Sequence, residues 1–252
     1  MTPSLYKKIT IGISVLLLAY SLIHYGKTGV LFSFQRNFSV GDFATCWPTY
    51  WAWKLNPQLI QQNPKIERAM TQANPYGTWQ YGPVLHYLLF PLLFLKSFKL
   101  ASSLWLVLCH LFLLLSMYIW YQILFIDKKL HSFSILAIYI SLWFNFFPIY
   151  EGLGSRIVEV LELFLLSFSF FALTRKKGLS SGVLLGLAIM TKFLPIIFLP
   201  YFFIKKQFRL VIAGLLTVLL IGASAEFTLG WKNNFTFQRM KGIGHGELSN
   251  LS

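Results

Sequence analysis

The sequence predicts an all-α, polytopic helical membrane protein, and three observations support this prediction. Hydrophobic residues make up 56% of the 252 residues, charged residues make up only 12%, and the mean hydropathy is +0.61. Several apolar runs are long enough to cross about 30 Å of hydrocarbon as helices. The formal net charge of +14 comes from basic residues that cluster in the short gaps between these runs. Such clustering is typical of cytoplasmic loops, and it argues against nucleic acid as a partner.

The apolar runs predict about seven crossings. The runs lie at 9–25, 82–95, 100–126, 132–149, 155–173, 179–191, 193–204 and 208–226. The first run follows Lys7 and Lys8 and lacks a small-residue cleavage site. We therefore expect a retained helix with a cytoplasmic N-terminus in the inner (plasma) membrane.

The basic residues between the runs predict the topology. Short loops rich in lysine and arginine resist translocation, so all of these groups are expected in the cytoplasm. They are Lys7/Lys8, Lys128/Lys129, Arg175/Lys176/Lys177 and Lys205/Lys206/Arg209. This arrangement requires that 82–95 does not cross the membrane. The segment is short and contains Pro83 and Pro91, so we interpret it as an interfacial helix within one long outer loop, 26–99. A true crossing at 82–95 is the alternative.

The segment 179–204 is predicted to be a hairpin of two short helices. Thr191-Lys192, Pro195 and Pro200 interrupt its apolar sequence. A hairpin whose tip points outward places Lys192 near the outer surface and Lys205/Lys206 inside. The alternative, one proline-kinked crossing, would export that basic pair.

Asp42 is the first candidate for chemistry. It lies in Gly41-Asp42-Phe43, about 15 residues beyond the first apolar run, at the head of a polar segment rich in tryptophan and tyrosine. The chain has only eight acidic residues, so few other side chains are able to act as a base at a membrane face. The alternative is that Asp42 caps a short helix.

Four further charged residues lie where charge is costly. Lys192 stands between two apolar runs, where it needs an anion or an interface. A lipid phosphate is one such anion, and snorkelling to the headgroups is the alternative. Arg156, Glu159 and Glu162 share roughly one helix face that must point into the bundle. They either hold a substrate or, through an Arg156–Glu159 pair, pin two helices together.

The five histidines make no metal-ligand spacing, so we expect no structural metal. His86 is the histidine near the Asp42 segment, where it either contacts substrate or lies at the interface. No cofactor motif is present, because the glycines of 178–186 lack the strand and lysine of a phosphate-binding loop.

The order of these motifs resembles a known family. Gly41-Asp42-Phe43 is followed by Asn74-Pro75-Tyr76, by Tyr81-Gly82-Pro83 and by Gly186-Leu-Ala-Ile-Met-Thr-Lys192. Over nearly the whole chain this order is similar to the GT-C superfamily of membrane glycosyltransferases, most closely the bacterial mannosyltransferase-like family that uses polyprenyl-phosphate sugars. The resemblance implies that Asp42 is the base and that Lys192 contacts the lipid phosphate. Members of that family are longer, so 1–252 is expected to be a single module that lacks C-terminal crossings.

The resemblance implies inverting sugar transfer from a polyprenyl-phosphate carrier to a hydroxyl of a glycan, glycolipid or protein at the outer face. Lys192 and Arg156 would neutralise the leaving phosphate, and the expected substrate contacts are Glu159, Glu162, Tyr76, Tyr81 and His86. One alternative is a lipid-linked-sugar flippase or transporter, in which Asp42 is only a cap. Another is a noncatalytic assembly subunit. Transfer is favoured because the charged candidates gather at the outer end of the predicted bundle.

Overall fold

The chain folds into a row of helices. The computed structural model describes residues 3–35, 43, 82–95, 98–126, 132–155 and 158–229. Its helices are α1 (Pro3–His24), a π-helix (Tyr25–Leu31), α2 (Phe32–Gln35), α6 (Pro83–Leu89), a 3-10 helix (Phe90–Phe94), α7 (Phe98–Tyr121), a π-helix (Gln122–Ile126), α8 (Phe133–Phe144), α9 (Phe147–Ser155), α10 (Glu159–Thr174), α11 (Gly178–Ile189), a 3-10 helix (Leu194–Ile197), α12 (Phe198–Ile204) and α13 (Phe208–Leu229). These residues contain no β-strand, which confirms the all-α class.

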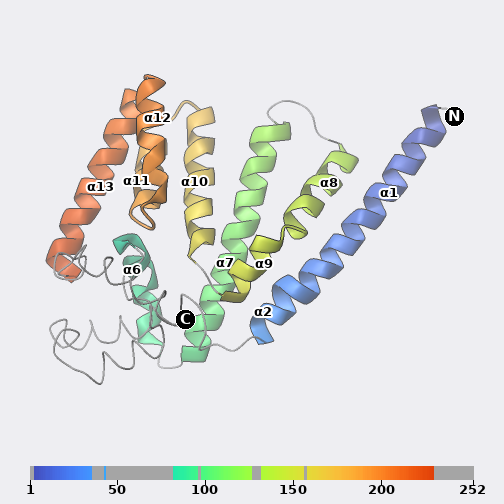
Figure 1. The fold of residues 1–252 in the computed structure, drawn as a ribbon, viewed down its shortest axis with the longest axis horizontal. Coiled ribbons are helices and arrows are strands. Elements are labelled where there is room, and N and C mark those ends of the chain that lie inside the picture. The colour runs from blue at the N-terminus through green and yellow to red at the C-terminus, as the bar shows by residue number, and fades with distance from the viewer. Residues whose placement is uncertain are drawn as a thin grey trace, which may run out of the picture.

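Figure 1 shows the order of the row. Helices α13, α11, α10 and α7 stand side by side, followed by α8 with α9 and then by α1. Three of the described helices are long and apolar enough to span a membrane: Leu5–Gln35, Lys99–Ile126 and Phe208–Ala225. Helices α8 and α9 qualify together as a fourth span that is bent by 50°. The chain is a polytopic membrane protein, and the total of about seven crossings stays a prediction.

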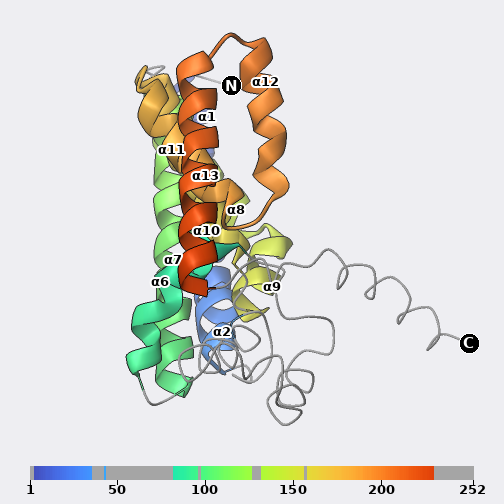
Figure 2. The same ribbon diagram turned by 90° about the vertical axis from the view of Figure 1, so that its left-hand side faces the viewer.

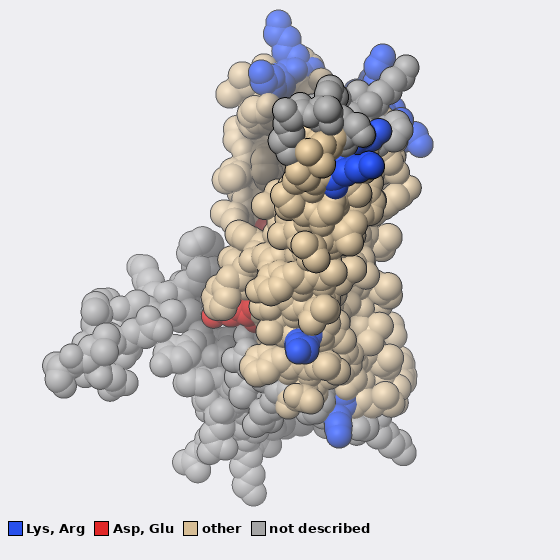
Figure 3. Space-filling view, turned by 90° about the vertical axis from the view of Figure 1, so that its right-hand side faces the viewer, with Lys and Arg blue, Asp and Glu red and all other residues tan. Residues whose placement is uncertain are grey.

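The helix connections separate the bundle into two ends. The start of α1, the α10–α11 turn and the α12–α13 turn lie at one end, shown at the top of Figure 1. Most of the lysine and arginine visible in Figure 3 gathers at this same end. Helix α6 lies toward the opposite end, so 82–95 does not run from one end to the other. This geometry supports the prediction that 82–95 does not cross the membrane. The predicted cytoplasmic pair Lys128/Lys129 lies outside the described residues.

The first helix is longer than its apolar run predicts. Helical backbone continues without a break to Gln35, so 26–35 belongs to the helix and not to the outer loop predicted for 26–99. Part of the reason is local hydrogen bonding, because the Thr28 hydroxyl donates to the backbone carbonyl of His24. A polar residue that bonds back to its own helix does not have to leave the apolar environment.

The run predicted as one crossing at 132–149 is broken after Phe144. The Asn145 side chain donates to Ser21 Oγ of α1 and to the Ser141 carbonyl, both at 2.8 Å. Pro148 then occupies the first turn of α9, where its missing N–H costs no helical hydrogen bond. These features separate α8 from α9; α9 ends at Ser155, and α10 begins at Glu159.

Neighbouring helices are joined by polar contacts within an apolar bundle. Tyr139 Oη donates to the Met117 carbonyl (2.7 Å), Trp120 Nε1 to Ser167 Oγ (3.0 Å) and Ser169 Oγ to the Ser181 carbonyl (2.8 Å). Helices α11 and α13 instead approach through glycine. A Cβ at Gly182 would lie 2.2 Å from the Leu210 carbonyl oxygen, which only a glycine avoids.

Candidate active site

The turn between α11 and α12 carries Lys192. Helix α11 ends because the backbone tightens there, where the amides of Thr191 and Lys192 both donate to the Ala188 carbonyl at 3.1 Å. Thr191 is buried and its hydroxyl donates to the Leu187 carbonyl at 2.9 Å. Pro195 then lies in the first turn of the 3-10 helix. The chain runs back through α12 toward the basic end, as Figure 2 shows. The segment is therefore a hairpin with Lys192 at its tip, rather than one kinked crossing.

Lys192 forms an ion pair with Glu159, the first residue of α10. The two side chains are 35% and 37% exposed, so the pair is neither at the free surface nor fully buried. A carboxylate in the first turn of a helix is also stabilised by the helix dipole. Its second oxygen, Glu159 Oε2, is buried and has no hydrogen-bond partner among the described residues. The pair thus keeps one acceptor available inside the bundle.

Glu162 lies on the same side of α10 and is buried, with only 7% of its surface exposed. The nearby charges that act on it are those of Lys192 and Glu159. The structure therefore brings together three of the residues that the sequence singles out. They comprise one ammonium and two carboxyl groups, a combination that can donate to and accept from an oxygen-rich ligand.

Helix α6 docks on this turn through its first residues. The Gly82 amide donates to the Thr191 carbonyl at 2.8 Å, and the Val84 amide donates to the Met190 carbonyl at 3.2 Å. A Cβ at Gly82 would lie 2.0 Å from the Met190 carbonyl oxygen, so glycine is required for this approach. Gly82 and the Met190-Thr191 pair, about a hundred residues apart in the sequence, thereby meet at one place.

Phe43 is fixed in the same core. Its ring is buried and stacks on Trp105 of α7, with ring centroids 6.3 Å apart. Phe43 belongs to one hydrophobic cluster with Leu85 of α6, Val158 before α10 and Ala188 of α11. The residue that follows Asp42 is therefore anchored in the cluster that also holds the residue before Glu159.

Several predicted site residues lie outside the described residues. These are Asp42, Arg156, Tyr76 and Tyr81, and for His86, which lies in α6, only the backbone is described. No group of three histidine, cysteine, aspartate or glutamate side chains in the described part of the chain is arranged to hold a metal ion. The absence of a metal site from the whole chain stays a prediction.

The site is recessed from the end of the bundle. Helix α11 has 12 residues, which at 1.5 Å per residue span about 18 Å of the roughly 30 Å hydrocarbon core. Helix α13 continues past the hairpin tip, and its Ser224 and Thr228 lie within hydrogen-bond distance of the Tyr87 hydroxyl of α6, at 2.9 Å and 2.7 Å. Helix α6 and the end of α13 thus border the tip of the hairpin.

The fold and this site define a class: a polytopic α-helical membrane protein with a charged site at the turn of a short hairpin, on the side away from the basic turns. Residues 79–245 match glycosyltransferase family 87, and the chain belongs to this family. This membership confirms the resemblance to the GT-C superfamily of membrane glycosyltransferases.

A relative supports the same class. The chain is 31% identical to an alpha-(1->3)-arabinofuranosyltransferase of Corynebacterium glutamicum over 98 residues. That match covers 38% of this chain and 22% of the relative, so the chain spans well under two thirds of the relative's length. No solved structure matches the chain.

The Lys192–Glu159 pair is the feature that sequence reasoning missed. Lys192 was predicted to contact phosphate and Glu159 to contact another substrate or Arg156, but the structure joins Lys192 to Glu159. A signal for this pairing exists in the topology, because the start of α10 and the tip of the α11–α12 hairpin must lie on the same side of the bundle. The exact partner depends on helix order in space, which the sequence pattern does not contain.

Proposed function

We propose that this glycosyltransferase moves a sugar from a polyprenyl-phosphate carrier to an acceptor hydroxyl at the outer membrane face. The observation that carries the proposal is the Lys192–Glu159 pair at the hairpin tip, where Gly82 and Val84 donate hydrogen bonds to the backbone of the turn. A lysine at this depth has a high cost unless an anion lies beside it. In the absence of donor, that anion is Glu159.

The proposed reaction is a single inverting displacement. The acceptor oxygen attacks the anomeric carbon as Asp42 takes the hydroxyl proton, and the bond from that carbon to the phosphate oxygen breaks. The electron pair leaves with the phosphate, whose charge Lys192 and Arg156 neutralise. The anchoring of Phe43 in the same hydrophobic cluster as Val158 supports this role, because it ties the neighbour of Asp42 to the core that also holds the residue before Glu159.

We propose that Glu159 holds Lys192 until the donor arrives. The donor phosphate is a diester with one negative charge, so it competes with the Glu159 carboxylate for the ammonium group at equal charge. The second negative charge that develops as the bond to the anomeric carbon breaks then strengthens its attraction to Lys192. Glu159 and Glu162 would then accept hydrogen bonds from sugar hydroxyls, and Tyr76, Tyr81 and His86 would contribute further contacts. No cofactor is proposed, because the polyprenyl-phosphate donor already carries the sugar in an activated form. The proposal does not depend on a divalent metal.

The sugar is proposed to be a pentose or a hexose. The name of the relative favours a furanose pentose, arabinofuranose, and mannose is the hexose to compare with it. The acceptor is a glycan, a glycolipid or a protein. The proposed location is the inner (plasma) membrane, with the N-terminus in the cytoplasm.

The test is sugar transfer in membranes that contain the chain at matched levels. Radiolabelled polyprenyl-phosphate arabinofuranose and polyprenyl-phosphate mannose are supplied as separate donors to the parent chain, Asp42→Asn and Lys192→Gln. We expect transfer from one donor, a loss of about 100-fold or more in Asp42→Asn, and a smaller loss in Lys192→Gln through weaker donor binding. Asp127→Asn serves as the matched carboxylate control. Undiminished transfer in Asp42→Asn would refute the assignment of the base.

A further inference from the structure

The two helix turns at the end opposite Lys192 enclose a basic cavity. Its volume is about 770 Å³, and its lining includes Lys176 and Lys177 from the α10–α11 turn together with Lys206 and Arg209 from the α12–α13 turn. All four side chains are exposed. No aspartate or glutamate is among the described residues that line the cavity. The cavity therefore presents four positive charges without a local counter-charge.

Two of these lysines occupy backbone positions that favour glycine. Lys176 has φ 58° and Lys206 has φ 57°, both in the left-handed region. Each closes its helix with the same pair of backbone hydrogen bonds, all at 2.9 Å. The Lys176 and Lys177 amides donate to the Leu173 and Ala172 carbonyls. The Lys206 and Gln207 amides donate to the Phe203 and Phe202 carbonyls. Glycine is the usual residue at this position of the motif because it has no Cβ. A lysine here twice indicates that its side chain is needed.

The cavity also borders the starts of two helices. Gly178, the first residue of α11, and Phe208, the first residue of α13, both line it. The first amides of a helix have no partner within that helix, and they attract anions. Amides and lysine side chains thus contribute attraction for negative charge at the same place.

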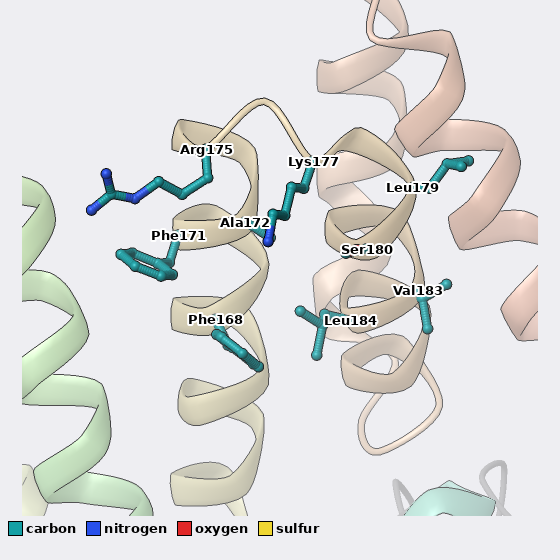
Figure 4. Close-up of a pocket in the computed structure, with 9 residues that line it drawn as sticks. All are labelled: Phe168, Phe171, Ala172, Arg175, Lys177, Leu179, Ser180, Val183 and Leu184. Carbon is teal, nitrogen blue, oxygen red and sulfur yellow. The ribbon is translucent and has the colours of Figure 1, made fainter.

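An apolar groove continues from the cavity between α10 and α11. A second cavity of about 530 Å³ shares Lys177, Leu179 and Ser180 with the first. Its walls include Phe168 and Leu184, and Figure 4 shows the Lys177 side chain lying between the two helices above these residues. The Arg175 guanidinium lies over the Phe171 ring at 5.0 Å. The site thus has a cationic head and an apolar tail.

We propose that these turns bind the phosphate headgroup of an anionic phospholipid, with one acyl chain in the groove between α10 and α11. Basic pockets between helices on the cytoplasmic side bind such headgroups. Cytoplasmic retention of a loop requires positive charge, but it requires neither a cavity nor lysine in the left-handed region. The continuous groove favours a lipid over a free phosphate. This site is separate from the Lys192 site and does not depend on the donor proposed there.

Native mass spectrometry of the purified chain in an uncharged detergent tests this proposal. The probes are phosphatidylglycerol, phosphatidylcholine and inorganic phosphate, and the variant is K176G/K206G. Glycine suits both backbone positions, so the variant keeps its fold and its thermal stability while it loses two charges. We expect phosphatidylglycerol to bind more tightly than phosphatidylcholine, and the double substitution to weaken it roughly 30-fold, at about five-fold for each lysine.

The matched control is K7Q/K8Q, which removes two charges from the same end of the bundle but away from the cavity. We expect it to bind phosphatidylglycerol as the parent chain does. Equal binding by K176G/K206G and the parent would overturn the site. The assignment to an anionic lipid would be overturned if the parent chain bound phosphatidylcholine as tightly as phosphatidylglycerol. It would also be overturned if inorganic phosphate displaced phosphatidylglycerol at a similar concentration.

Discussion

At the residue scale, the Lys192–Glu159 pair is the main feature of the site. Exposed ion pairs contribute about 0.2–1 kcal/mol, whereas breaking a buried pair costs about 3–5 kcal/mol because one charge stays uncompensated. With roughly a third of each side chain exposed, this pair lies between those limits. Its value to the protein is therefore positional: it orients the ammonium group beside the first turn of α10.

This position predicts non-additive effects on stability. We expect Glu159→Gln and Lys192→Met each to lower the free energy of unfolding by about 1–2 kcal/mol, because each removes one member of the ion pair and leaves the other charge less compensated. The double variant should lose clearly less than the sum of the two. Thermal unfolding in detergent of the four proteins measures the coupling, and additive losses would mean that the two groups do not interact.

At the element scale, glycine determines how closely α11 packs on α13. A Cβ at Gly186 would lie 2.6 Å from Thr217 Cβ and 2.8 Å from the Gly214 carbonyl oxygen, and the space at Gly182 is tighter still. Thr217, which lies opposite Gly186, donates its hydroxyl to the Ala213 carbonyl of its own helix at 2.8 Å. Close backbone approach at these glycines therefore brings α11 and α13 together, and Leu185 and Ile189 of α11 join Leu210 and Val211 of α13 in one buried cluster.

The helix contact predicts opposite effects of the same substitution at two sites. Gly182→Ala should lower stability by about 1–3 kcal/mol, because the new methyl group forces α11 away from α13. Gly12→Ala in α1 has no atom within 4 Å of its added Cβ, so it should be neutral or stabilising by up to about 1 kcal/mol through helix propensity. Thermal unfolding distinguishes them, and equal shifts would contradict the packing argument.

A third glycine connects packing to activity. In Gly82→Ala, the added Cβ meets the Met190 carbonyl and displaces α6 from the hairpin tip. We expect sugar transfer to fall at least ten-fold, because small displacements of a positioned group cost about that much or more. Thermal stability should change far less than in Gly182→Ala, since the described backbone joins Gly82 and the start of α6 to the turn through two hydrogen bonds. Full activity in the Gly82 variant would separate α6 from the reaction.

At the scale of the whole molecule, the apolar pattern predicts most of the helices. The run 100–126 corresponds to helix from Phe98 to Ile126, and the hairpin with Lys192 at its tip follows from Pro195 and the basic residues after it. The pattern does not reveal that the first helix continues through Lys27 and Thr28, because hydropathy does not register a hydroxyl bonded to its own helix. The break at Asn145 is likewise missed, although Pro148 signals it.

The candidate site is predicted less completely for a physical reason. Lys192 and Glu159 are recognisable as costly charges, but their pairing arises only from the packing of α10 beside α11. The need for glycine at position 82 likewise arises from a tertiary contact, the close approach of the Met190 carbonyl. Single residues that are unfavourable in an apolar bundle are visible in the sequence, whereas the neighbours that compensate for them require the fold.

The arrangement of the whole bundle predicts which residues can be reached from each side of the membrane. The start of α1 and the α12–α13 turn lie at one end, so single cysteines at Lys8 and Gln207 should react with a membrane-impermeant maleimide only from the cytoplasm. The native Cys46, in the segment predicted to lie outside, should react with the same reagent only from the outer face, and therefore already in intact cells. Each of the three cysteines is tested in a protein that lacks the other two: Cys46→Ser is added to the Lys8→Cys and Gln207→Cys proteins, and Cys109→Ala, at a buried position, is added to all three.

Labelling of Lys8→Cys and Gln207→Cys from opposite sides would mean that the chain crosses the membrane an odd number of times between them. In that case 82–95 or the α11–α12 hairpin would cross differently, and the Lys192 site would lose its assigned face.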